Sequence, residues 1–393
     1  MGIDAKNHEV LVIGSGVIGS SIAYHLARQG HDVLVLEARS GVAASPVASW
    51  ASAGGVRRQG RHPAEAALAI ESIARWPTLE QELEADIGYR QGGNLMLAET
   101  EDEAEQLVHF VHQQQVMGFT DVRLIDRHEA LQLVSGLNPQ VIAGSYSPSD
   151  GQADPALTTR AFAAAAQRLG ATYQFNTPAL SLLTQSGRVT GARTNQGDFY
   201  AQHIVLSAGA WSDTLAASIG LHLPIRTLAL QMVLSTPAQP GLLQPVLSAL
   251  GRALSLKQLN DGSFLLGGGW LGDATPDRQS YTMRPESIEG NWRTACELLP
   301  VVGQQRIERS WCGLEAESVD EIPFIGPVEG EGWEGLIVAA GFSGHGFAIS
   351  VGVGRVVGDM VGGLGGREVE GLSPSRIANF SEEQIEDKPR SLL

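Results

Sequence analysis

A strand, a glycine-rich turn and a helix open the chain, and they restrict its fold more than any other feature. Residues 9–13 (EVLVI) form an apolar run typical of a buried strand, and the turn GSGVIG occupies residues 14–19. The pattern of residues 20–30 predicts an amphipathic helix, and DVLVLE at 32–37 predicts a second strand ending in Glu37. That carboxylate stands about twenty residues past the glycines, where it can accept the ribose hydroxyls of a dinucleotide.

Each glycine of the turn has a distinct physical task. Gly14 allows the tight bend, Gly16 lets a pyrophosphate approach the backbone, and Gly19 lets the helix pack closely on the strand. Val17 and Ile18 open the helix, where free N–H groups face phosphate. A glycine triplet alone is weak evidence, but the triplet together with its strands, helix and terminal acid predicts a dinucleotide-binding site.

Size and composition narrow the class of protein. A chain of 393 residues is too long for one ordinary core, so we expect two domains or one large α/β unit with an insertion. The net charge of −16 argues against a nucleic-acid partner. No apolar run approaches the roughly 18–20 residues that span a bilayer. No signal-peptide pattern precedes the first strand, so a cytoplasmic enzyme is the expectation. With two cysteines, Cys296 and Cys312, neither a disulfide framework nor a metal site is predicted.

Strand-like and helical patterns alternate along the rest of the chain and predict an α/β fold. The strands of the nucleotide-binding domain come from separated segments, so this domain is expected to be discontinuous. Its predicted segments are residues 1–85, 145–215 and 325–375. The intervening residues, 86–144 and 216–324, are predicted to form a second, sheet-based domain, and residues 376–393 a polar tail.

Five motifs spread over nearly the whole chain carry a family resemblance. They are VIGSGVIGSSIAYHLARQGHDVLVLE at 12–37, SAGG at 52–55, DGQADP at 150–155, VLSAGAWS at 205–212, and IPFIGPV with GFSGHGF between 322 and 347. Together they resemble the D-amino-acid-oxidase-like family of FAD-dependent oxidoreductases, which includes glycine and sarcosine oxidases, proline dehydrogenases and opine oxidase subunits. The resemblance implies a Rossmann-type, glutathione-reductase-like FAD-binding domain and a mixed-sheet substrate domain that covers the flavin.

The resemblance also implies which residues bind FAD, without a covalent bond. Along the pyrophosphate and adenosine lie Gly14, Gly16, Val17, Ile18, Gly19, Glu37, Ala38, Arg39 and Ala179. Along the middle of the cofactor and the flavin ring lie Ser45, Ala53, Gly54, Gly55, Ala208, Gly209, Trp211, Gly341, Ser343, Gly344, His345, Gly346 and Phe347. A helix beginning near Gly346 would point its N-terminus at flavin N1, where reduced flavin becomes anionic and a helix dipole stabilises the charge.

His345, Arg57 and Arg58 are the first candidates for contact with the flavin or the substrate. By resemblance His345 contacts the flavin, and a role in proton transfer is the weaker alternative. An arginine fork suits a carboxylate, so one of the two arginines is expected to touch the substrate, the alternative being a surface pair. Arg61 and His62 are weaker candidates.

Glu315 departs from the family pattern. Glycine-oxidase-like relatives have a Gly-Leu-Arg motif whose arginine grips the substrate carboxylate, and this chain has Gly313-Leu314-Glu315. Glu315 would repel an α-carboxylate or recognise a cationic group, as on an opine with a basic side chain. An ion pair with a protein arginine is an equally supported alternative.

Positions on the predicted strands of the second domain bear on the cofactor, the electron acceptor and the site. Cys312 lies close to the position at which monomeric sarcosine oxidase links a cysteine to flavin, but packing is the simpler interpretation. Where sarcosine oxidase has an oxygen-activating lysine, residues 264–266 are Phe-Leu-Leu, which favours a dehydrogenase over an oxidase. Lys257 and Gln258 are on a strand that could face the site.

The resemblance and the residues together favour an FAD-dependent dehydrogenase or oxidase of a secondary amine or imino acid that is opine-, proline- or N-alkyl-glycine-like. Hydride would pass from the α-carbon to flavin N5, and the resulting imine would hydrolyse. One alternative is a glycine, sarcosine or D-amino-acid oxidase that makes hydrogen peroxide. Another is an electron-transfer flavoprotein subunit of a hetero-oligomeric dehydrogenase, with a small partner subunit or a quinone as acceptor.

Overall fold

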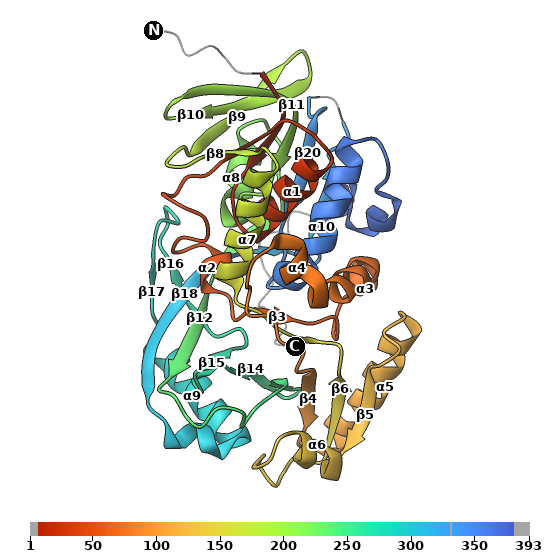
Figure 1. Ribbon diagram of the computed structural model, residues 1–393, viewed down its shortest axis with the longest axis vertical. Coiled ribbons are helices and arrows are strands. Elements are labelled where there is room, and N and C mark those ends of the chain that lie inside the picture. The colour runs from red at the N-terminus through yellow and green to blue at the C-terminus, as the bar shows by residue number, and fades with distance from the viewer. Residues whose placement is uncertain (1–6, 331, 381–393) are drawn as a thin grey trace.

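Two β-sheets with helices around and between them make up the fold of the computed structural model (Figure 1). The structure describes residues 7–330 and 332–380. The eight-stranded sheet lies in the upper part of Figure 1 and the ten-stranded sheet in the lower part. Among the described residues, the α-helices are α1 (Val17–Arg28), α2 (Ala48–Ala51), α3 (Ala66–Arg75), α4 (Leu79–Leu83), α5 (Glu101–Val116), α6 (Arg127–Leu133), α7 (Pro155–Arg168), α8 (Ser212–Ala217), α9 (Pro285–Leu298) and α10 (Gly346–Val361).

The eight-stranded sheet has a parallel centre. Its strands follow the order β19-β20-β11-β1-β2-β8, and β10 and β9 extend it from β11 as antiparallel strands. They are β1 (Asn7–Ile13), β2 (Val33–Leu36), β8 (Thr172–Gln174), β9 (Ala179–Gln185), β10 (Arg188–Thr194), β11 (Gly197–Leu206), β19 (Phe324–Pro327) and β20 (Leu336–Ala340). Val10 and Val12 of β1 enter one apolar core, and Leu11 and Ile13 enter another. Both faces are covered, which explains why this strand is apolar without alternation.

The ten-stranded sheet covers the other half of the molecule. Its order is β17-β16-β12-β15-β14-β13-β4-β6-β5, with β18 paired to β12. Its strands are β4 (Asn94–Ala98), β5 (Arg123–Asp126), β6 (Ala143–Ser147), β12 (Ile225–Ser235), β13 (Val246–Ala249), β14 (Arg252–Gln258), β15 (Phe264–Gly267), β16 (Leu271–Ala274), β17 (Tyr281–Thr282) and β18 (Ile307–Ser318). One face packs through Leu95, Leu256 and Leu266 on Leu298 of α9 and its neighbours. A short ribbon of β3 (Gly55–Val56) and β7 (Gly151–Gln152) lies between the two sheets (Figure 1).

Residues 381–393, the greater part of the predicted tail, lie outside the described residues. Arg376, which precedes them, places Nε 3.0 Å from Asp320 Oδ2 and its guanidinium 3.8 Å from the ring centroid of Phe324. Within the described ranges, the helices are too short or too polar to cross a bilayer.

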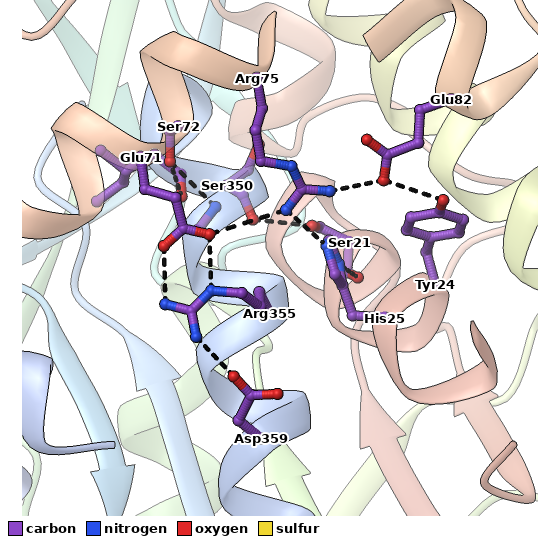
Figure 2. Close-up of polar contacts among 12 residues, drawn as sticks. Ser21, Tyr24, His25, Glu71, Ser72, Arg75, Glu82, Ser350, Arg355 and Asp359 are labelled. Atoms are coloured by element: carbon purple, nitrogen blue, oxygen red, sulfur yellow. Dashed lines mark hydrogen bonds and ion pairs between the residues drawn. The ribbon is translucent and has the colours of Figure 1, made fainter. Parts of the chain in front are cut away.

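Helices α1 and α3 meet around a buried histidine (Figure 2). His25 is 5% exposed, and its Nδ1 lies 2.8 Å from the carbonyl oxygen of Ser21. Burial lowers the pKa of His25 to about 3, so the ring is neutral. Its Nδ1–H therefore donates to Ser21, and Nε2 accepts from Arg75 Nη1 at 3.1 Å. Arg75 also donates to Glu82 at 2.6 Å, and Glu82 accepts the hydroxyl of Tyr24 at 3.1 Å.

Helix α10 joins this group through an ion pair and a close helix crossing (Figure 2). Arg355 Nε and Nη2 donate to the two carboxylate oxygens of Glu71 at 2.6 and 2.7 Å. A Cβ at Gly354 would overlap Ser21 Oγ and lie 2.6 Å from His25 Nδ1. The distance between α1 and α10 therefore depends on the absence of a side chain at Gly354.

Replacing Gly354 with alanine is expected to lower the melting temperature, because overpacking a close contact typically costs about 1–3 kcal/mol. Gly362→Ala is the matched control at the end of the same helix. Its Cβ would meet its nearest neighbours at 3.6 Å, an ordinary contact. Thermal unfolding of both variants checks this, and equal melting temperatures would show that α1 and α10 separate without cost.

Candidate functional site

The turn after β1 brings three backbone segments together. Gly14 has φ +102°, and a Cβ there would lie 2.6 Å from the carbonyl oxygen of Ser207, which follows β11. A Cβ at Gly19 would overlap the carbonyl oxygen of Gly14, so α1 lies directly on the turn. Gly16 differs, because a Cβ there would meet Ser49 Oγ at 3.3 Å and no other described atom within 4 Å. The backbone at Gly16 is therefore open to a ligand.

Glu37 places a buried carboxylate beside this turn. It is 8% exposed, and its Oε2 accepts from the N–H of Ser15 at 2.9 Å and from its hydroxyl at 2.7 Å. Its Oε1 accepts from the N–H of Arg39 at 2.8 Å, and Ala38 between them is exposed. The loop after β8 closes on the same residue, where the Thr177 N–H donates to the Glu37 carbonyl at 2.9 Å. The carboxylate is thus fixed in position next to the glycines.

The remaining predicted adenosine-side residues lie around the same strand ends. The Arg39 guanidinium is 5.5 Å from a ring centroid of Trp211. Ala179 and Ala208 pack against the apolar cluster that contains the end of β1. Gly209 has φ +54° and is exposed. Residues far apart in the sequence therefore surround one edge of the eight-stranded sheet.

Ser49 is a site residue that sequence reasoning missed. It lies in α2, and its Oγ accepts from the N–H of Val17 at 2.9 Å. Val17 and Ile18 form the first turn of α1, where a phosphate is expected to bind. The only sequence signal is a serine in a small-residue loop, and the serine chosen there, Ser45, is exposed.

The loop that contains α2 is held against β18. The Leu314 N–H donates to the Pro46 carbonyl at 2.8 Å, and the Trp311 indole donates to the Ala51 carbonyl at 3.1 Å. A Cβ at Gly313 would overlap the Cβ of Ala51. The loop and the strand therefore touch without intervening side chains at this point.

The predicted flavin-side residues continue this loop across the ten-stranded sheet. Ala53 packs against an apolar cluster that includes Leu265 of β15. Gly54 has φ +70°, and a Cβ there would overlap the carbonyl oxygen of Ala153. Gly55 begins β3, which pairs with β7. These small residues let the loop pass between the two sheets.

The turn between β20 and α10 is attached to β18 as well. Gly341, Ser343 and Gly344 have φ of +74°, +51° and +80°. The Ser343 N–H donates to the Ala316 carbonyl at 2.9 Å. Glu315, the preceding residue on β18, is half-buried.

Arg57, Arg61, Glu65 and His345 form a polar cluster at the start of α10. Arg61 is 4% exposed, Glu65 is 0% exposed, and His345 Nδ1 lies 3.5 Å from Glu65 Oε2. Arg61 Nε and Nη2 donate to the Arg57 carbonyl at 3.2 and 2.9 Å. Within the described residues, Arg61 Nη1, Glu65 Oε1 and His345 Nδ1 are buried without a hydrogen-bond partner. Buried polar atoms are nearly always paired, so three unpaired ones together indicate a site for a polar ligand.

Burial and mutual charge set the protonation states of this cluster. Burial, and then the charge of Arg57, lower the pKa of Arg61 to about 10, so its guanidinium stays charged at neutral pH. Burial and Arg61 lower the pKa of His345 despite Glu65, which favours a neutral ring. Burial raises the pKa of Glu65, but His345 and Arg61 lower it by more, so the carboxyl is ionised. The cluster thus presents the charged guanidinium of Arg61 and the ionised carboxyl of Glu65, with the positive charge of Arg57 beside them.

Arg58, the other predicted arginine, is turned away from this cluster. Its backbone N–H donates to Asp150 at 3.0 Å, while its guanidinium pairs with Asp121 and lies 5.7 Å from the ring centroid of Phe119. The structure therefore brings Arg57 and Arg61 to His345, and gives Arg58 a protein partner. Glu65 was missed, because it ends the short 3-10 helix Pro63–Glu65 and its contact with His345 joins residues far apart in the sequence.

Two side chains with reactive chemistry are buried on strands of the ten-stranded sheet. Cys312 Sγ lies 3.5 Å from Met283 Sδ, and burial raises the pKa of the thiol to about 12. Lys257 of β14 is 4% exposed, and burial lowers its pKa to about 7. The thiol is protonated at neutral pH, and the amine is close to its titration midpoint.

Comparison with known proteins decides the family. A family described as "DAO: FAD dependent oxidoreductase" matches residues 9–360. The chain belongs to this family. Glycine oxidase from Geobacillus kaustophilus is 31% identical over 363 residues, covering 90% of this chain and 93% of the relative. An opine oxidase subunit from Agrobacterium tumefaciens is 28% identical over 347 residues, covering 86% of this chain and 89% of the relative.

Two further comparisons bear on length and fold. Dimethylglycine dehydrogenase from Homo sapiens is 30% identical over 383 residues, 90% of this chain, but this chain spans only 42% of that protein. The structure of L-proline dehydrogenase from P. horikoshii matches with a TM-score of 0.88 and 28% identity, covering 95% of this chain and 98% of that one. The predicted family and fold class are confirmed, and the chain is an FAD-dependent oxidoreductase related to enzymes of amino-acid oxidation.

The residues at the first turn fit the cofactor of this family. The backbone at Gly16 is open to a ligand. Glu37 has the sequence spacing from the glycines at which a carboxylate binds the ribose hydroxyls, and Ser49 adds a hydroxyl at the start of α1. Gly346 and Phe347 are buried in the first turn of α10, whose N-terminus can face an anionic ring.

Gly16→Ala is expected to remove bound FAD while leaving the melting temperature of the apoprotein nearly unchanged, because the new Cβ would point into the ligand space. Gly19→Ala is the matched contrast, since its Cβ would strike the protein itself and lower that melting temperature. Flavin content by absorbance and thermal unfolding of both apoproteins check this. Wild-type flavin content in Gly16→Ala would show that the pyrophosphate does not approach this residue.

Proposed function

We propose that the protein oxidises a secondary amine or imino acid, of the opine, proline or N-alkyl-glycine type, and that it works as a dehydrogenase. Bound FAD would take the hydride of the substrate α-carbon at N5. The observation that carries the proposal is the buried cluster of Arg61, Glu65 and His345 with its three unpaired polar atoms. The relatives named as a glycine oxidase, an opine oxidase subunit and an L-proline dehydrogenase support the substrate class.

Each member of the cluster has a task in this proposal. Arg61 binds the substrate carboxylate through Nη1, and Arg57 adds positive charge beside it. Glu65 offers Oε1 to the substrate nitrogen, and a neutral His345 offers its unprotonated ring nitrogen as an acceptor of the amine proton. The amine must be neutral before it can release hydride, so this acceptor favours the reactive form. Glu315 is proposed to recognise a second, cationic group of the substrate.

The electron acceptor is proposed to be a partner subunit or a quinone, with oxygen disfavoured. Residues 264–266, Phe-Leu-Leu, stand where sarcosine oxidase has its oxygen-activating lysine, and Leu265 among them lies in an apolar cluster with Met232 and Leu234. The relative from Agrobacterium tumefaciens is named as one subunit of an opine oxidase, which supports a role within a complex. Non-covalent FAD is supported by Cys312, because a thiol that stays protonated is a poor nucleophile.

The experiment that tests the function is anaerobic mixing of the holoprotein with a panel of opines, prolines and N-alkyl glycines while flavin absorbance is followed. At least one of these amines is expected to bleach the flavin, and faster turnover is expected with a dye acceptor than with oxygen. Failure of every compound to bleach would refute the substrate proposal. Peroxide formed as fast as dye is reduced would instead identify an oxidase. Acid precipitation is expected to release the flavin.

Arg61→Lys is expected to lower kcat/KM by about 10- to 100-fold, mainly through KM, because it loses Nη1, which binds the carboxylate in a charge-assisted hydrogen bond. Arg58→Lys is the control, since that arginine already pairs with Asp121. Steady-state kinetics with a dye acceptor check this, and equal losses in the two variants would remove Arg61 from substrate binding.

A further inference from the structure

Lys257 is a buried lysine with no fixed partner. It is 4% exposed, and no hydrogen bond or ion pair joins its amine to any described residue. Asp154 is the acid whose charge raises the pKa of Lys257. Its carboxylate already caps α7, where it accepts a hydrogen bond from the Leu157 N–H at 2.8 Å. The nearby cation, Arg90, donates to the Gln258 carbonyl at 2.5 Å. The surroundings therefore hold the Lys257 amine without a direct counter-charge.

The strand register decides which way this side chain points. Lys257 pairs with Leu265, and its neighbour Leu256 pairs with Leu266. Leu256 and Leu266 pack in the apolar core with α9, whereas Leu265 packs with Ala53 on the opposite face. Paired residues share a face of a sheet. Lys257 is therefore on the face turned toward the FAD-binding half of the chain.

The loop that carries the candidate arginines crosses this same face. At one end Ala53 packs beside Leu265 of β15, and at the other Gln59 donates to Asn94 of β4 at 2.7 Å and accepts the hydroxyl of Ser145 of β6. Strands β14 and β13 lie between β15 and β4 in the sheet. Residues 54–58 therefore pass over the strands that include Lys257.

An unpaired ammonium in such a place is unfavourable for folding. Burial is the first cause that lowers the pKa of Lys257 to about 7, Arg90 lowers it further, and Asp154 opposes. An apolar side chain of similar length would avoid this cost, so the amine indicates a ligand group that is absent from the protein itself. A carboxylate is the ligand that would stabilise the charged form.

We propose that Lys257 binds a second carboxylate of the substrate, so that the amine oxidised here carries an anionic group on its nitrogen substituent, as N-carboxyalkyl amino acids do. The inference rests on the proposed function, in which Arg61 holds the first carboxylate. Lys257 then selects dicarboxylic secondary amines over N-methyl or unsubstituted amino acids.

Two sulfur analogues test this proposal on the oxidised holoprotein, because they replace the amine and differ in one carboxylate. They are thiodiacetate and (methylthio)acetate, and their Kd values are read from the perturbation of the flavin spectrum. Wild-type protein is expected to bind thiodiacetate at least about 10-fold more tightly, the effect of one charge-assisted hydrogen bond. Lys257→Met is expected to lose that preference and to change the Kd of (methylthio)acetate by less than about 3-fold, since that ligand never reaches Lys257.

Further variants and measurements control for charge and for folding. Lys257→Arg is expected to keep most of the preference, and Arg293→Gln, which removes an exposed charge on α9, is expected to keep all of it. Flavin content and melting temperature of Lys257→Met are expected to equal or exceed wild type, because a buried charge is removed. Lys257→Gln provides a second neutral variant.

Three results would overturn the inference. The first is that wild-type protein binds the two acids with equal affinity. The second is that Lys257→Met weakens the binding of both acids equally. The third is that this variant changes only the reaction of reduced flavin with oxygen. Each is compatible with anaerobic bleaching by a monocarboxylic amine, which would leave the proposed function intact. Absence of bleaching by any amine refutes the proposed function separately.

Discussion

The loop between Pro46 and Gln59 fixes how the two sheets meet, and the site depends on it. Its carbonyls at Pro46 and Ala51 accept hydrogen bonds from β18, and Gln59 bonds to two strands at the far side of the same sheet. Buried backbone groups must stay paired, so the loop cannot shift without exposing or orphaning them. The glycines at 54 and 313 let backbone approach backbone along this path. These hydrogen bonds therefore also fix the positions of Arg57 and Arg61.

Burial at this junction gives the candidate site its chemical character. Arg61, Glu65 and Lys257 are all at least nine-tenths buried, in a protein whose net charge is strongly negative. A charge held away from water interacts strongly with a ligand but weakens folding when no ligand is bound. The paired charges of α1, α3 and α10 in Figure 2 contrast with this, because Arg75 and Arg355 there have protein carboxylates as partners. Buried charges without a protein counter-charge therefore mark the candidate ligand site, whereas the charges between α1, α3 and α10 are paired and belong to the scaffold.

The sequence predicted the first strand, turn, helix and second strand correctly because this unit is local. Gly14, Gly19 and Glu37 belong to one strand-turn-helix-strand unit, and their spacing alone fixes how they meet. The choice between Arg57 and Arg58 is different, since neighbouring residues of an extended segment point in opposite directions. Arg58 forms an ion pair with Asp121, which is far away in the sequence. No sequence motif around Asp121 predicts this contact. The burial of Arg61 beside Glu65 and His345 is likewise a property of the packed molecule.

The amino-acid sequence by itself determined the family, the Rossmann-type unit and the FAD cofactor, because motifs with fixed spacing encode short-range backbone geometry. It also placed Lys257 on a strand, and alternation showed that the lysine must lie on one of two faces. Only the tertiary structure decided which face, through the pairing of Lys257 with Leu265. It likewise brought Glu65 to His345 and left their polar atoms unpaired. Burial and the sign of neighbouring charges are properties of the packed molecule, and spacing along the chain does not contain them.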